Sequence, residues 1–144
     1  MMTMNKIKYF ALAELVHTDS GKTNVPSWAE LDNLMRLGEF LDGVRTDFGA
    51  PISINSAYRS EAVNQAVGGS KTSAHRLGLA ADIHASRGTE MQNRLLLAIL
   101  EQRLGSIDQL ISYHKVPGDR SSEIRFIHVG LAKSGSPRCQ RLYK

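Results

Sequence analysis

The chain has 144 residues, of which 42% are hydrophobic and 22% charged, and its net charge is +4. This length is sufficient for one domain with its own hydrophobic core, and no stretch is apolar for long enough to cross a membrane. Its one cysteine, Cys139, excludes an internal disulfide. Basic residues are dispersed and aromatic residues make up 6%, so we expect neither nucleic acid nor a membrane as a partner.

The N-terminal segment does not have the pattern of a secretory signal. Two lysines precede a short apolar run at residues 9–13, and Glu14 then interrupts that run. A signal peptide has a longer apolar region followed by a cleavage site with small residues. We therefore expect synthesis in the cytoplasm without a signal peptide.

A long amphipathic helix is the first clear element. Ser27 is a candidate N-cap, and Glu30 follows three residues later, which is the spacing of a capping box. Apolar residues then recur mostly at three- and four-residue spacing until Gly49, namely Leu31, Leu34, Met35, Leu37, Phe40, Leu41 and Val44. We expect the leucines of this helix and Trp28 to lie in the core.

Strands and helices are mixed in the rest of the chain. The pattern predicts strands at residues 52–57, 79–85, 107–114 and 124–131, a short helix between Ser60 and Gly68, a third helix at 89–104 and an irregular tail. A short loop joins the last two strands, which favours antiparallel pairing. The predicted fold class is α+β, with a small antiparallel sheet flanked by helices in a single domain spanning residues 1–144.

Three side chains of this predicted sheet form a candidate metal site. Period two puts Asp82 and His84 on one face of their strand, and His128 on one face of the last strand. Asp82 is either an ordinary core carboxylate held by backbone donors or part of a site with His75, seven residues earlier. Two imidazoles and one carboxylate are a common ligand set for catalytic zinc, with the fourth position left to water. His75, Asp82 and His128 are the candidate ligands.

The same residues carry a resemblance to a known family. The segment S-A-H-R-L-G-L-A-A-D-I at residues 73–83 resembles the S-x-H-x-x-G-x-A-x-D signature of the zinc D-alanyl-D-alanine carboxypeptidases, a family that includes L-alanyl-D-glutamate peptidases and phage endolysins. F-I-H-V-G at 126–130 resembles the closing motif of that family, and I-N-S-A-Y-R-S at 54–60 resembles the segment with its substrate-binding arginine. The similar segments span residues 41–131. They imply the hedgehog/D-Ala-D-Ala carboxypeptidase-like zinc peptidase fold.

The resemblance also implies roles for individual residues. His75, Asp82 and His128 would hold one Zn²⁺ ion. Arg59 would bind a substrate carboxylate or polarise the scissile carbonyl, which suits a planar guanidinium, although a surface arginine at a helix start is the alternative. Ser73 is either a hydroxyl partner of the substrate or site, or a residue that closes a turn.

The general base departs from the family pattern. Members commonly have an acidic residue three positions before the last histidine, where this chain has Arg125. Related branches have a glutamate at the end of the preceding strand, in a D-Q-L-I-x-E segment, but here the sequence is D-Q-L-I-S-Y-H with Tyr113 at that place. We predict that Glu123 is the general base, with His114 as the alternative. Asp108 is expected to be structural.

The predicted function is zinc-dependent hydrolysis of peptidoglycan stem peptides, either as a D-Ala-D-Ala carboxypeptidase or as an endolysin-type endopeptidase. We expect a monomer that acts on the cell wall, as a phage or prophage endolysin would. Because position 125 carries an arginine, a second hypothesis is a non-catalytic zinc-containing module that binds the cell wall or belongs to a phage particle.

Overall fold

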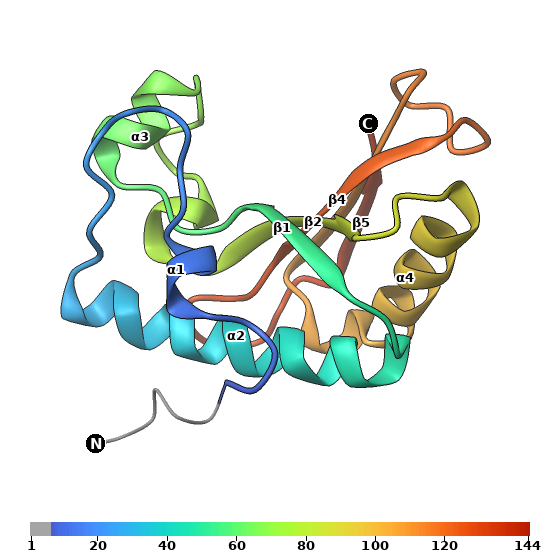
Figure 1. Cartoon of the computed structure of the whole chain (residues 1–144), viewed down its shortest axis with the longest axis horizontal. Coiled ribbons are helices and arrows are strands. Elements are labelled where there is room, and N and C mark those ends of the chain that lie inside the picture. Colours follow the sequence, from blue (N-terminus) through green and yellow to red (C-terminus); the bar gives the residue numbers. More distant parts are fainter. Residues whose placement is uncertain (1–6) are drawn as a thin grey trace.

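The computed structural model describes residues 7–144 (Figure 1). Its helices are α1 (Leu12–Leu15), α2 (Trp28–Phe48), α3 (Glu61–Ala66) and α4 (Glu90–Gln102), with two 3₁₀ turns, η2 (Ala74–Leu77) and η3 (Leu104–Ser106). Its strands are β1 (Ile52–Ser56), β2 (Ala80–Ala85), β3 (Gln109–His114), β4 (Ile124–Gly130) and β5 (Gln140–Tyr143). The predicted α+β class is confirmed. Among the described residues no helix is both long and apolar enough to span a bilayer.

Helix α2 begins and ends where the sequence predicts. The Ser27 side chain accepts a hydrogen bond from the Glu30 amide, and the Glu30 carboxylate accepts one from the Ser27 amide, which completes the capping box. Gly49 ends the helix in the left-handed conformation, with φ of 74°. The prediction for Trp28 is wrong, because this side chain is 84% exposed. It belongs to the first turn, before the apolar stripe of α2 reaches the core.

The five strands form one sheet in the order β1-β2-β4-β3-β5. Neighbouring strands are antiparallel except β5, which pairs in parallel with β3. The sheet is therefore mixed rather than purely antiparallel. The prediction of an irregular tail is wrong for residues 140–143, which form β5. All four residues of β5 are of intermediate burial. Their sequence, Q-R-L-Y, lacks the alternation of apolar and polar residues that predicts a strand.

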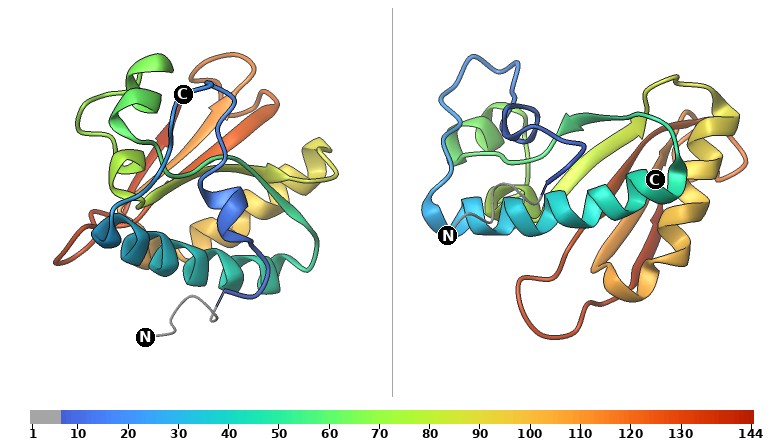
Figure 2. Two further views of the ribbon diagram at one scale, coloured as in Figure 1. Left: turned by 60° about the vertical axis from the view of Figure 1, so that its left-hand side comes forward. Right: turned by 60° about the horizontal axis from the view of Figure 1, so that its bottom comes forward.

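The two faces of the sheet have different surroundings. Helix α4 packs against β2, β3 and β4 on one face and also contacts α2 (Figure 2). Ala81 and Ile83 of β2 and Ile127 of β4 belong to the hydrophobic core on this side, together with leucines of α2 and α4. The alternate residues of the same strands, which include Asp82 and His128, face the other side. That side carries the candidate site.

Candidate metal centre

Three segments that are distant in the sequence bring His75, Asp82 and His128 together. His75 comes from η2, Asp82 from β2 and His128 from β4, and the sheet register places Asp82 directly opposite His128. One ligand atom of each residue lies within 4.8 Å of those of the other two. Asp82 Oδ1 is 3.0 Å from His128 Nδ1 and 3.4 Å from His75 Nε2. In the part of the chain that the structure describes, this is the one such group of three ligating side chains.

The donor chemistry of the cluster fits a divalent cation. His75 Nδ1 lies 2.7 Å from the carbonyl oxygen of Ala57, so this nitrogen carries the ring hydrogen and Nε2 keeps its lone pair for a metal. Burial alone would raise the pKa of Asp82, but the hydrogen bond from His128 and the nearby His75 together outweigh burial and hold that pKa well below its usual value. Two imidazoles and an ionised carboxylate are thus available as ligands, and the His75 side chain is only 3% exposed.

Arg59 lies beside this cluster rather than on the open surface. Its Nη2 is 3.4 Å from Asp82 Oδ2, its Nε donates to the Ser56 hydroxyl at 3.2 Å, and the side chain is 16% exposed. Nearby, Asn64 Oδ1 is a buried atom without a hydrogen-bond partner among the described residues. An added Cβ on Gly69 would lie 2.1 Å from that oxygen and 3.2 Å from Arg59 Nη1, so this glycine is required for close packing.

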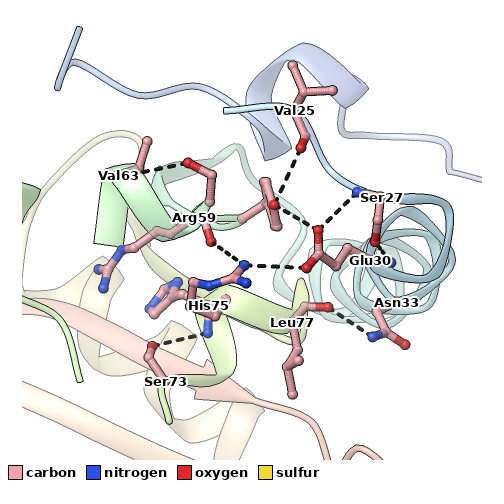
Figure 3. A network of polar contacts seen from close by, with 12 residues as sticks. Val25, Ser27, Glu30, Asn33, Arg59, Val63, Ser73, His75 and Leu77 are labelled. Atoms are coloured by element: carbon pink, nitrogen blue, oxygen red, sulfur yellow. Dashed lines mark hydrogen bonds and ion pairs between the residues drawn. The ribbon is translucent and has the colours of Figure 1, made fainter. Parts of the chain in front are cut away.

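A polar network holds the backbone segments of Arg59 and His75 against the start of α2 (Figure 3). Arg76 Nη1 donates to Glu30 Oε2 at 3.3 Å and to the Arg59 carbonyl at 3.2 Å, and the Arg59 amide donates to the His75 carbonyl at 3.0 Å. The Tyr58 hydroxyl donates to Glu30 Oε1 at 2.8 Å. The sequence indicated only the capping role of Glu30, because a contact between residues 30 and 76 leaves no local signal.

The pKa values within this network follow from the same contacts. Burial acts to raise the pKa of Glu30, but hydrogen bonds from Ser27 and Tyr58 and the charge of Arg76 lower it overall. Burial and the Glu30 carboxylate raise the pKa of Tyr58 to about 12. Glu30 is therefore an anion and Tyr58 a hydrogen-bond donor throughout the neutral range.

The turn after His75 requires a glycine at position 78. Its φ is 77°, and an added Cβ would lie 2.7 Å from the carbonyl oxygen of Glu30. Asn33 of α2 donates to the carbonyl of Leu77 at 2.9 Å, one residue before. Both the positive φ and the close approach of α2 thus exclude a side chain at this position.

The cluster lines a cleft of about 680 Å³. Basic side chains also line it, namely Arg59, Lys133, Arg138 and Lys144, whereas Asp82 and Asp108 are the carboxylates among its lining residues. Asp108 is held by Arg138, whose Nη2 lies 2.9 Å from Asp108 Oδ2, and this hydrogen bond lowers the pKa of Asp108. The structural role predicted for Asp108 agrees with this ion pair. With a metal in the cluster, the cleft would be strongly cationic.

Comparison with known families agrees with this geometry. The model of the family described as Peptidase M15 matches residues 8–114. The chain belongs to the peptidase M15 family. This membership confirms the predicted family resemblance and supports a metallopeptidase whose metal the cluster can hold. The matched segment contains Arg59, His75 and Asp82 but ends before β4, and the structure itself places His128 of β4 in the cluster. No curated protein matches the chain.

Neither predicted general base lies in the cleft of this M15 domain. Glu123 is exposed in the loop before β4 and is absent from the residues that line the cleft. His114 is 2% exposed on the opposite face of the sheet, where its ring nitrogens lie 2.7 Å from the Ser112 hydroxyl and 2.9 Å from the Ser122 carbonyl. Strand alternation is the reason, because Tyr113 points into the cleft when its neighbour His114 does not. The structure therefore places neither Glu123 nor His114, the two predicted bases, beside the metal cluster.

Ser73 closes the turn that carries His75, which is one of its two predicted roles. Its hydroxyl accepts a hydrogen bond from the His75 amide at 3.2 Å and so caps η2, the turn that carries the first candidate ligand. The same residue lines the cleft. Ser73 therefore supports His75 from a position where a substrate can also reach it.

Proposed function

We propose that this M15 chain is a zinc-dependent peptidase that hydrolyses a peptide bond in the stem peptides of bacterial peptidoglycan. The observation that carries the proposal is the buried His75–Asp82–His128 cluster within an otherwise cationic cleft. Zinc held there would lower the pKa of water toward neutrality and polarise the scissile carbonyl.

The protein's own side chains would bind and orient the substrate. Arg59 offers a planar fork of donors next to the cluster, which is suited to a peptide carboxylate. Lys133 and Lys144 line the same cleft and make no ion pair with any described residue. These cations favour a substrate with several carboxylates, as stem peptides have.

The bond that is cleaved and the place where the protein acts are proposed from the sequence resemblance. The substrate bond is a terminal D-Ala-D-Ala bond for a carboxypeptidase, or an internal bond for an endolysin-type endopeptidase. We place the activity at the cell wall, in the manner of a phage or prophage endolysin acting as a monomer.

A second candidate function is favoured by one specific observation. The two carboxylates that line the cleft are both engaged, Asp82 with the histidines and Asp108 with Arg138. Among the described residues, no other side-chain carboxylate lines the cleft to accept a proton, as would be expected of a non-catalytic zinc module that binds the cell wall.

Digestion of purified muropeptides distinguishes the two functions. The protein is loaded with one equivalent of zinc, and the products are identified by mass spectrometry. We expect release of a peptide or amino acid that a chelator abolishes and added zinc restores, and the products identify the bond. Binding of one zinc ion and of muropeptides without any release would contradict the peptidase and establish the binding module.

A further inference from the structure

Tyr113 lines the same cleft as the metal cluster. It lies on β3 opposite Phe126 of β4, and the neighbouring pair in the same register is Ile111 with His128. Tyr113 and His128 are therefore diagonal neighbours on one face of the sheet, a relation that typically separates Cα atoms by about 7–8 Å. The length of a tyrosine side chain covers such a separation, so the phenol can reach the space beside the metal cluster.

The surroundings of Tyr113 fix its ring but leave its hydroxyl free. The ring stacks on Phe126 with a centroid distance of 4.5 Å and an interplanar angle of 15°. Among the described residues, none makes a hydrogen bond with the Tyr113 hydroxyl, whereas the Tyr58 hydroxyl is held by Glu30. A phenol that is oriented by stacking and has an unused donor suits the binding of a ligand atom.

Burial is the main influence on the pKa of the Tyr113 hydroxyl. Burial raises the pKa of its hydroxyl, the negative charge of Asp82 raises it further, and Arg59 acts in the opposite direction. The net effect is a raised pKa, so the group donates a hydrogen bond at neutral pH. It is poorly suited to accept a proton.

Tyr113 and Arg59 reach the cluster from different ends of β2. The Arg59 backbone is bonded to His75, in the turn just before β2 begins. Tyr113 stands at the level of Phe126, one step beyond the His128–Asp82 pair toward the end of β2. A substrate over the cluster would thus meet one donor on each side.

We propose that Tyr113 is a catalytic residue whose hydroxyl donates a hydrogen bond to the oxygen of the scissile carbonyl as that oxygen gains negative charge. The inference rests on the proposed peptidase function. A donor in a cleft with little water is worth most when it faces an oxygen that becomes charged during the reaction. No proton needs to leave Tyr113 for this role, which is consistent with its raised pKa.

The test compares zinc-loaded wild type, Tyr113→Phe and Tyr143→Phe. Tyr143 is the matched control, because it pairs with Ser112 and lies on the face of the sheet away from the cleft. Phosphinate analogues of D-alanyl-D-alanine and of L-alanyl-D-glutamate serve as probes, since their tetrahedral anionic oxygens mimic the charged carbonyl oxygen. Affinity is measured by calorimetry, and kcat and KM are measured on the peptide that the wild type cleaves.

We expect Tyr113→Phe to weaken phosphinate binding by about tenfold and to lower kcat by about 10²-fold with little change in KM. Tyr143→Phe should match the wild type in both measurements. Equal phosphinate affinity of Tyr113→Phe and wild type, or no binding of either probe to the wild type, overturns the inference. If the phosphinate difference appears while the wild type releases no product, the Tyr113 hydroxyl contacts the ligand, but the peptidase function fails and its catalytic role fails with it.

Discussion

The two faces of the central sheet are built from alternate residues of the same strands, yet they obey different physical requirements. Ile83 faces α4 and the core, where it is fully buried among apolar side chains. Asp82, its neighbour, is almost as buried on the other face but is surrounded by His75, His128 and Arg59. One face thus gains stability from removing apolar surface from water, whereas the other keeps charges in a poorly hydrated site at an energetic cost that only partners can offset.

The largest effect is expected for the cleft face, at Asp82. The substitution Asp82→Asn removes the anionic ligand, so stoichiometric zinc binding and all zinc-dependent turnover should be lost. Zinc should raise the thermal midpoint of the wild type but leave that of Asp82→Asn unchanged, because only a folded state that binds the ion is stabilised by it. Calorimetric titration together with thermal unfolding measures both effects. A variant that binds zinc as tightly as the wild type would contradict the ligand assignment.

Substitution of Ile83, the residue next to Asp82, should lower stability but leave zinc binding intact. Ile83→Ala leaves a cavity in the core and should lower the free energy of unfolding by about 2–5 kcal/mol, as measured by urea denaturation. The folded fraction should still bind one equivalent of zinc. Loss of zinc binding in fully folded Ile83→Ala would show that the two faces are less independent than their contacts indicate.

A smaller effect is expected where α2 meets the turn that carries His75. Gly78→Ala combines an unfavourable positive φ with a Cβ that approaches the Glu30 carbonyl, so we expect a loss of about 2–3 kcal/mol in unfolding free energy. Gly49→Ala is the matched control, because its φ is also positive but no atom lies within 4 Å of the added Cβ. Equal losses of unfolding free energy in the two variants would show that the positive φ alone explains the effect and that the contact with the Glu30 carbonyl adds nothing.

The smallest effect concerns the network under the cleft. The pKa of Glu30 is lower in the folded protein than in the unfolded chain, so its contribution to stability is present above the unfolded-state value and is lost as the pH falls through the folded one. Between pH 6 and pH 3 the wild type should therefore lose more stability than Glu30→Gln. Urea midpoints at the two pH values measure the difference, with Glu39→Gln from the same helix as control. Equal losses of stability between pH 6 and pH 3 in wild type and Glu30→Gln would contradict a stabilising role for the ionised Glu30 carboxylate.

The sequence predicted the parts of the molecule that have local causes. The capping box defined α2, and strand alternation alone put Asp82 and His128 on one face of their strands. The same alternation, applied to β3, would have placed Tyr113 in the cleft and His114 behind the sheet. The prediction of His114 overlooked that parity.

Other features have no local cause and escaped prediction. The hydrogen bonds that link Arg76 to Glu30 and to Arg59 join residues that are far apart in the chain. Nothing in the sequence near residue 30 specifies these bonds. The exposure of Trp28 depends on where α2 overhangs the core, which is a property of the tertiary structure. β5 lacks alternation because both of its faces are only half-buried.

The parallel pairing of β5 with β3 changes the position of β3 in the sheet. Without β5, the strand that carries Tyr113 would be an outer strand whose amides exchange readily with solvent and can pair with another chain. With β5 in place, the His114 amide is bonded to the Lys144 carbonyl, and the outermost position passes to a strand of four residues that includes Arg141. We therefore expect the last few residues of the described chain to slow amide exchange along β3 and to oppose edge-to-edge association.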